Sequence, residues 1–255
     1  MSKKIGILFL LLLFYINAYA EPKKHFYVSY DPDYAPFTYL AKNSPEGLLI
    51  DYWKLWAKRN NYKISFINGG TWKNATLLAK EKKVDFFIGS FAYESWMRES
   101  KAYYKTQTSL FIKKNNVNTY DTSSRVKIGI IGKDYKKSIS SHMPNALVTV
   151  YINYDSVIKD LIDKKIDMFY DDKIAVEFYS LQNKIFHGIQ AIDLINEYTP
   201  KCAISANEEL IKIFNNGLKK ISENELFEIK KKWILNQDFK FFKNNSKRWW
   251  NGNLS

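Results

Sequence analysis

The 255-residue chain has a single cysteine, Cys202, and only three histidines. One cysteine excludes an internal disulfide, and Cys202 lies too far from the N-terminal region to be a lipid-anchoring residue, so it is expected to be a small buried hydrophobe. The histidines, His25, His142 and His187, show no metal-ligand spacing. The sequence also lacks a Gly-x-Ser-x-Gly elbow and a Gly-rich phosphate loop before a basic helix. We therefore predict no metal, no cofactor and no catalytic machinery of these kinds.

Long apolar runs are scarce as well, and the one that stands out covers residues 5–16. It has about 12 residues, against the ~20 needed to span a bilayer. Two lysines, Lys3 and Lys4, precede it, and Ala18-Tyr19-Ala20 offers small residues where a signal peptidase reads them. This order predicts a secretory signal peptide over residues 1–20, cleaved after Ala20, and a periplasmic location. A retained N-terminal anchor is the alternative.

Negative charge is in deficit, because 39 lysines and arginines face 26 acidic residues, giving a formal net charge of +13. Such a balance can indicate nucleic acid or an anionic membrane as partner. Here the lysines are scattered, without a basic stripe, an RNA-binding aromatic motif or a recognition helix. The charge is interpreted as mostly solvated surface with a modest bias toward anionic ligands or partners, and no nucleic acid is expected.

Hydrophobic patterning predicts two α/β units in tandem. Strands and helices alternate as β-α-β-α-β over residues 25–88, where Thr71 is a plausible N-cap of a helix, and a similar rhythm returns over residues 126–170. This order is typical of parallel sheets covered by helices. Two further helices, at residues 208–222 and 224–235, have no new sheet to cover and are expected to pack on the first unit.

The predicted fold class is therefore α/β with two lobes and a hinge of two crossover segments. About 235 residues remain after processing, which suits two lobes. The predicted boundaries are a signal peptide over 1–20, lobe 1 over 21–112, lobe 2 over 113–198, and a return to lobe 1 over 199–255 that ends in a basic, aromatic tail.

Several fragments of the chain resemble the bacterial extracellular solute-binding proteins of family 3, the polar amino acid type, and the related Venus-flytrap sensor domains. The resemblance covers nearly the whole mature chain and lies in the order and spacing of residues 31–37 with 47–51, Trp72 with 84–85 and Arg98, 166–167 with Asp172, and 208–210 with 232–233. It implies ligand binding between two hinged lobes, at the carboxyl ends of their strands. The implied protein is a monomer that captures an amino acid or a derivative for an inner-membrane ABC permease.

The resemblance assigns two charged residues to the ligand. Arg98 occupies the position whose guanidinium clamps the ligand carboxylate with two parallel hydrogen bonds. The alternative is a surface arginine paired with Glu94 or Glu99. Asp172 occupies the position that accepts hydrogen bonds from the ligand's amino group, and the alternative is a cap on the following helix by Asp171 or Asp172.

Other residues complete the predicted site. Tyr34 matches the aromatic residue that packs over the ligand, although a core aromatic is the rival interpretation. Asp31 begins the same loop, Trp96 is a further candidate wall, and Ser90 offers a hydroxyl beside Arg98.

One departure from the family pattern concerns the loop after the first strand of lobe 2. Where the family often has Gly-Thr, which binds the carboxylate, this chain has Lys133-Asp134. Either Lys133 replaces the lost contact or the ligand is not a free amino acid. Two alternative functions remain beside binding for transport: a dehydratase of cyclohexadienyl acids that uses Asp172 as a buried acid, and a periplasmic receptor for a sensor protein.

Overall fold

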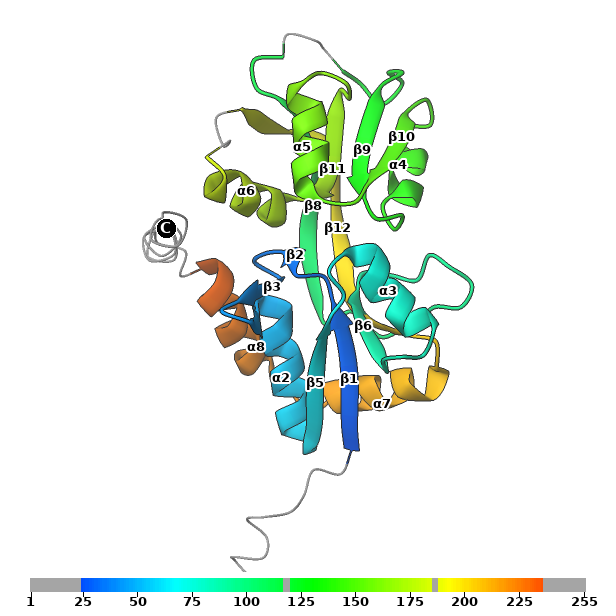
Figure 1. Ribbon diagram of the computed structural model, residues 1–255, viewed down its shortest axis with the longest axis vertical. Coiled ribbons are helices and arrows are strands. Elements are labelled where there is room, and N and C mark those ends of the chain that lie inside the picture. The colour runs from blue at the N-terminus through cyan, green and yellow to red at the C-terminus, as the bar shows by residue number, and fades with distance from the viewer. Residues whose placement is uncertain (1–23, 117–119, 185–187, 236–255) are drawn as a thin grey trace, which may run out of the picture.

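The computed structural model describes residues 24–116, 120–184 and 188–235. The predicted signal peptide, its cleavage site and the basic tail after residue 235 lie outside the described residues. The described chain folds into two lobes joined by a pair of long strands, and Figure 1 shows the lobes one above the other. No helix within the described ranges is long and apolar enough to cross a membrane.

The strands within the described ranges form two sheets. Nine strands form one curled sheet in the order β10-β9-β11-β8-β12-β6-β1-β5, with β7 on β12, and three form a small sheet in the order β2-β3-β4. Their bounds are β1 Lys24–Tyr30, β2 Asp33–Tyr34, β3 Thr38–Ala41, β4 Ser44–Glu46, β5 Tyr62–Asn68, β6 Phe86–Gly89, β7 Arg98–Glu99, β8 Tyr104–Lys113, β9 Lys127–Ile131, β10 Leu147–Tyr151, β11 Met168–Asp172 and β12 Ile189–Ser205.

In the first lobe, β1 pairs in parallel with both β5 and β6. Its helices are α2 (Leu48–Asn60), α3 (Trp72–Lys80), α7 (Glu208–Leu218), α8 (Glu223–Lys230) and a π-helical turn, η1 (Lys231–Leu235). Aromatic packing holds α7 on α2, because Trp53 packs in a tilted arrangement on Phe214 and Trp56 stacks on it, at centroid distances of 4.6 and 5.0 Å. The Trp56 indole also donates to the Phe214 carbonyl at 3.1 Å.

In the second lobe, β9 pairs in parallel with β10 and β11. Its helices are α4 (Lys136–His142), α5 (Tyr154–Ile162) and α6 (Lys173–Gln182). α5 is strongly amphipathic: Val157, Ile158 and Leu161 are buried at helical spacing. Parallel pairing in both lobes confirms the prediction of two tandem β-α-β units with parallel sheets.

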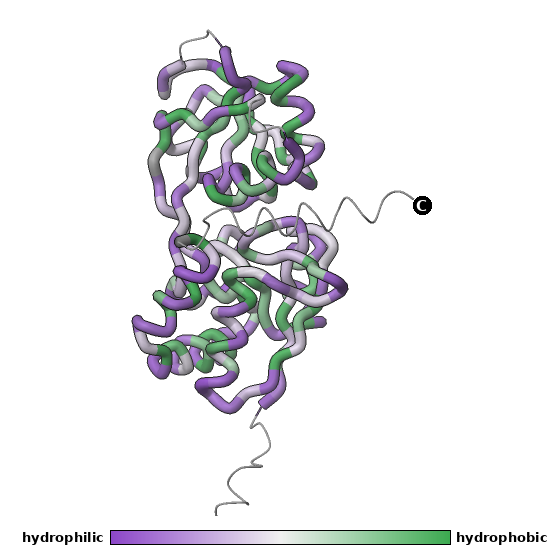
Figure 2. Tube along the Cα trace, turned by 90° about the vertical axis from the view of Figure 1, so that its left-hand side faces the viewer, coloured by the Kyte–Doolittle hydropathy of each residue, from purple (hydrophilic) through white to green (hydrophobic). Residues whose placement is uncertain are grey.

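The hinge consists of β8 and β12, which run antiparallel to each other and take part in both lobes. β8 pairs with β11 of the second lobe from Thr108 onward, and β12 pairs with β6 of the first lobe from Cys202 onward. The chain therefore passes from one lobe to the other within each of these two strands, and in β8 it does so before residue 112. Figure 2, turned by 90°, shows the two lobes as separate bodies. The lobe boundaries drawn from the sequence stay a prediction.

Candidate functional site

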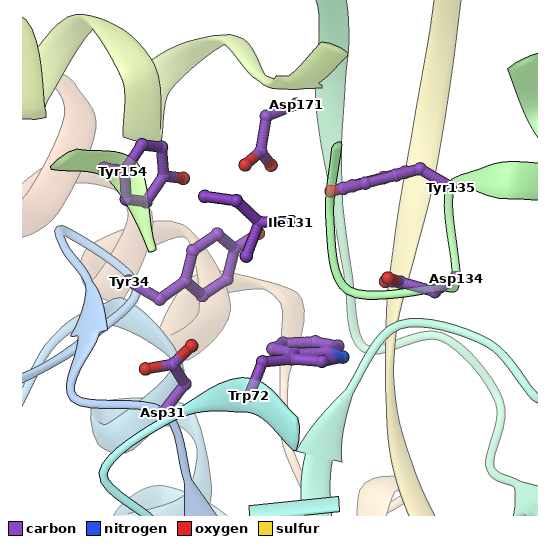
Figure 3. Close-up of a pocket in the computed structure, with 8 residues that line it drawn as sticks. All are labelled: Asp31, Tyr34, Trp72, Ile131, Asp134, Tyr135, Tyr154 and Asp171. Carbon is purple, nitrogen blue, oxygen red and sulfur yellow. The ribbon is translucent and has the colours of Figure 1, made fainter. Parts of the chain in front are cut away.

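A small cavity lies between the lobes, with a volume of about 20 Å³. Figure 3 shows the eight side chains that line it: Asp31, Tyr34, Trp72, Ile131, Asp134, Tyr135, Tyr154 and Asp171. They come from the loop after β1, strand β2, the start of α3, the end of β9, the segment between β9 and α4, the start of α5 and the end of β11. This is where the carboxyl ends of parallel strands meet. A cavity of this size holds about one water molecule, so the lobes are closed on their own side chains.

Asp172 forms the centre of a hydrogen-bond cluster beside the cavity. Its Oδ2 atom accepts from the Tyr135 hydroxyl and from the Lys201 ammonium, both at 2.7 Å, and from the Tyr34 hydroxyl. Tyr34 belongs to the first lobe, Tyr135 to the second, and Lys201 to the hinge strand β12. One carboxylate therefore ties both lobes and the hinge together.

Three further aspartates line the cavity, and burial changes their protonation. Burial raises the pKa of Asp31 to about 7, against a lowering by the backbone amide of Asp33. Burial also raises the pKa of Asp134 to about 7, and the nearby Lys201 ammonium opposes that rise. The pKa of Asp171 is raised by burial and by the charge of the adjacent Asp172. Asp31 and Asp134 therefore change their charge near neutral pH.

Aromatic rings form the rest of the wall. Tyr34 and Trp72 meet edge to face, with centroids 6.0 Å apart, and Tyr135 and Tyr154 approach from the second lobe. Burial raises the pKa of all three tyrosines well above 10. Their hydroxyls therefore keep their protons at neutral pH and act as hydrogen-bond donors.

The structure brings four of the seven sequence-predicted residues together. Asp31 and Tyr34 line the cavity, and Asp172 lies beside it. Ser90 joins through Lys201, whose ammonium is 3.2 Å from the serine hydroxyl. Tyr34 also packs on Phe37 at 4.8 Å between centroids, so it has core contacts as well as a place in the cavity wall.

Arg98 lies away from the cavity. Its side chain is 48% exposed, with Nε 3.6 Å from the Glu208 carboxylate, and its guanidinium donates to the backbone carbonyls of Ser95 and Met97. This is a surface pairing, although with Glu208 and not with the two glutamates considered from the sequence. The role of Arg98 as a carboxylate clamp stays a prediction.

Two other predicted residues also lie outside the cavity wall. Trp96 is half-buried and its indole donates to the Glu94 carboxylate at 2.7 Å. Lys133 is exposed, whereas the next residue, Asp134, is 2% exposed and lines the cavity. In the pair that departs from the family pattern, the acidic residue therefore turns inward and the basic one turns outward.

The helix-cap alternative for Asp172 does not hold. Asp172 stands at the N-cap position of α6, but its side chain makes no capping hydrogen bond. Its carboxylate is instead used by Tyr34, Tyr135 and Lys201. Asp171 uses one carboxylate oxygen to accept from the backbone amide of Asp172 at 2.7 Å.

The sequence analysis did not predict six residues of the wall, Ile131 among them, or Lys201. Trp72 appeared in the family pattern without a site role, Asp134 marked a departure from that pattern, and Asp171 was considered only as a cap. Tyr135, Tyr154 and Lys201 carried no signal, because a tyrosine at a helix start and a lysine within a strand are ordinary features of a lysine-rich, aromatic-rich chain.

Comparison with known proteins identifies the family of this chain, and the solved structures similar to it share its fold. The family model described as bacterial extracellular solute-binding proteins, family 3, matches residues 26–236. Comparison with curated protein sequences finds no match.

Three solved structures illustrate the similarity. An ancestral arginine-binding protein bound to glutamine is 19% identical with a TM-score of 0.69, covering 82% of this chain and 97% of that one. The periplasmic VFT2 domain of BvgS from Bordetella pertussis is 17% identical with a TM-score of 0.68, covering 84% and 94%. The ancestral amino acid-binding protein AncCDT-1, a precursor of cyclohexadienyl dehydratase, is 20% identical with a TM-score of 0.66, covering 82% and 94%. The two-lobed Venus-flytrap fold expected from the sequence is confirmed.

Proposed function

Because this chain belongs to the bacterial extracellular solute-binding proteins of family 3, we propose that it binds a small polar ligand, an amino acid or a close relative, between its lobes. We further propose that it acts as a periplasmic monomer that delivers this ligand to an inner-membrane ABC permease. One observation carries the proposal: Asp31 and Tyr34 of the first lobe line a small cavity between the lobes, and the Tyr34 hydroxyl reaches Asp172 of the second lobe beside it. The similar ancestral arginine-binding protein, whose solved structures hold glutamine or arginine, supports the same ligand class.

Binding requires the lobes to open, since a cavity of about 20 Å³ is too small for an amino acid. Tyr34 is the side chain to be displaced, because it reaches from the first lobe to Asp172 in the second. A ligand that replaces this contact and adds others favours reclosure, since only a difference in affinity between two states shifts their equilibrium. The strands β8 and β12 provide the hinge for that motion.

The test combines three measurements on the exported protein. Native mass spectrometry identifies any small molecule that copurifies, thermal melts screen the twenty amino acids and their decarboxylated relatives, and small-angle scattering measures compaction and molecular mass. We expect stabilisation and compaction by at least one compound, and loss of both in Asp172→Asn. Asp163→Asn is the matched control, because Asp163 forms a surface pair with Lys159. A protein that no small molecule stabilises or compacts contradicts the proposal.

Export is tested separately. We propose cleavage after Ala20, and the intact mass of the protein recovered from the periplasm then corresponds to a chain that begins at Glu21. A recovered chain that still carries residues 1–20 contradicts this.

Binding without turnover is proposed because the dehydratase alternative relied on Asp172 as a buried acid. That carboxylate is instead occupied by the Lys201 ammonium at 2.7 Å. Incubation with cyclohexadienyl acids is expected to give no product. Product formation that Asp172→Asn abolishes would restore the enzyme alternative.

A receptor for a sensor protein is the second candidate, and one observation favours it. Tyr34, Tyr135 and Lys201 connect both lobes and the hinge strand through the Asp172 carboxylate. A ligand that competes for these contacts would change how the two lobes sit on each other, and such a change is what a sensor protein would detect. Flanking genes for a permease or for a sensor kinase distinguish the two candidates.

A further inference from the structure

The charged groups buried at the cavity are unequal in number. Three aspartates line it and Asp172 adjoins it, whereas Lys201 is the one lysine or arginine buried beside them within the described ranges. The Lys201 ammonium is already used by Asp172 and Ser90. Asp134 and Asp171 also lie within reach of this one ammonium, so a single buried lysine faces four aspartates in the described part of the chain.

Two carboxylate oxygens in this cluster lack a hydrogen-bond donor. Asp134 Oδ1 and Asp172 Oδ1 are fully buried and have no partner among the described residues. Asp134 is 2% exposed and lines the cavity (Figure 3). Buried polar groups in folded proteins are normally paired, so these oxygens point to a donor that the described part of the chain does not supply.

The aromatic wall has the second property that a cation needs. Tyr34, Trp72, Tyr135 and Tyr154 surround the same cavity, and the faces of such rings attract cations. The chain contains an example of this contact, since the Lys201 ammonium is 5.2 Å from the Tyr34 ring centroid. An ammonium group held by an aspartate and a tyrosine ring is therefore already present beside the cavity.

A receptor for a ligand carboxylate is missing from the described wall. A carboxylate is held best by a bidentate guanidinium, but Arg98 lies on the surface against Glu208 and Lys133 is exposed. The Trp72 indole NH and the Tyr154 hydroxyl line the wall and have no hydrogen-bond partner among the described residues, but both are neutral donors. A carboxylate placed in this cavity would face Asp31, Asp134 and Asp171.

From this arrangement we infer that the ligand of the cleft is an organic amine that carries one or more ammonium groups and no carboxylate. The inference rests on the proposed function and narrows its ligand class, amino acids and their close relatives, to the decarboxylated relatives. Asp134 and Asp172 receive the ammonium hydrogens, and the rings of Tyr34, Trp72, Tyr135 and Tyr154 enclose the carbon chain.

Matched ligand pairs test the inference, because each pair differs only in the carboxylate. Isothermal titration compares agmatine with L-arginine, cadaverine with L-lysine and putrescine with L-ornithine, at pH 8 and low salt. We expect at least one amine to bind at least tenfold more tightly than its amino acid. A pair in which the amino acid binds more tightly, with no amine bound in the other pairs, overturns the inference and leaves the proposed function standing.

One variant and a matched control test whether Asp134 binds the ammonium group. Asp134→Asn keeps the size of the side chain and removes its charge, and we expect it to weaken amine binding at least tenfold. Asp163→Asn removes a surface carboxylate and is expected to leave binding unchanged. Equal amine affinity in Asp134→Asn and wild type, with both folded by circular dichroism, overturns the assignment. A protein that binds neither members of these pairs nor any other small molecule overturns both the inference and the proposed function.

Discussion

Lys201 and Asp172 form an ion pair with Nζ and Oδ2 2.7 Å apart, and their side chains are 1% and 0% exposed. Neither charge has access to solvent, so each depends on the other and on neighbouring hydroxyls. Tyr34 and Tyr135 donate to the same carboxylate oxygen, and Ser90 contacts the ammonium. The pair therefore connects the hinge strand β12 to the end of β11 in the second lobe.

Removing one partner of this pair is expected to be costly. Lys201→Met leaves the Asp172 carboxylate buried without a counter-charge, and we expect the free energy of unfolding to fall by about 3–5 kcal/mol. Chemical denaturation measures this. The double variant Lys201→Met with Asp172→Leu should regain part of the loss, because it removes both charges. If the free energy of unfolding of Lys201→Met falls by less than about 1 kcal/mol, the value typical of surface pairs, the ion pair is not an important source of stability.

Tyr34→Phe is expected to loosen closure without disturbing the fold. The ring keeps its packing on Phe37 and Trp72, but the hydroxyl that reaches Asp172 is lost. We expect a larger radius of gyration for the ligand-free variant, measured by small-angle scattering. Tyr39→Phe is the control, because its hydroxyl contacts the exposed Glu46 within the small sheet. A scattering profile identical to wild type would show that other contacts hold the lobes closed.

Tyr34 was predicted from the sequence to pack over the ligand, so we expect Tyr34→Ala to bind ligand more weakly and to keep the fold. The core contacts of Tyr34 add some loss of thermal stability to this. Calorimetric titration and thermal melts of the same sample measure both effects. If most of the stability is lost, the core interpretation of Tyr34 is right.

Stability is expected to depend on pH through the buried carboxyls. The pKa of Asp31 and of Asp134 rises from about 4 in the unfolded chain to about 7 in the folded one. Between these values the folded state binds more protons, so the free energy of unfolding falls as pH rises, by about 1.4 kcal/mol per pH unit for each carboxyl. Asp31 faces Asp33 and the Trp72 backbone, and Asp134 faces Lys201, Asp172, Tyr93 and Ser90.

Denaturation of wild type and Asp134→Asn at pH 5 and pH 8 isolates the contribution of Asp134. The asparagine variant should lose that part of the pH dependence. Because an ammonium ligand favours the ionised carboxyls, amine binding should strengthen from pH 5 to pH 8, whereas binding of a carboxylate should weaken. A wild type and a variant with equal slopes would contradict the raised pKa of Asp134.

Arg98→Ala distinguishes the site seen in the closed structure from the site expected from the family pattern. Its pairing with Glu208 is exposed, so we expect a loss of at most about 1 kcal/mol in stability. We also expect unchanged amine binding by calorimetric titration. If Arg98→Ala instead abolishes binding of an amino acid, as Asp172→Asn should, then Arg98 turns into the open cleft and the carboxylate-clamp prediction is right.

The sequence predicted the regular elements well where hydrophobic periodicity was strong. Thr71 was expected as an N-cap, and its side chain accepts from the Asn74 amide at 3.2 Å. Cys202 was expected to be buried, and it is. The strand β8 was missed, because it lies within a mixed polar and apolar stretch that joins the two units. Its burial comes from pairing with β11 and β12, which are distant in the sequence.

The candidate site was only partly predictable for a related reason. Asp31, Tyr34 and Asp172 occupy positions that the family's sequence pattern marks. Lys201 becomes a site residue only because β12 passes beside the end of β11. Asp134 and Lys133 differ by one position, and only the turn after Gly132, with its φ of 77°, decides which of them points inward. Sequence patterns do not specify the direction of a side chain in such a turn.

The hinge strands determine which contacts survive when the cleft opens. In a rotation about β8 and β12, an atom moves in proportion to its distance from the pivot. Lys201 lies on β12, and Asp172 pairs with Thr108 of β8, so both ends of their ion pair are close to that pivot. Tyr34 belongs to the small sheet and reaches Asp172 from farther away. We therefore expect opening to release the tyrosine while the lysine stays in place, so that an incoming ligand meets a carboxylate that is already half neutralised.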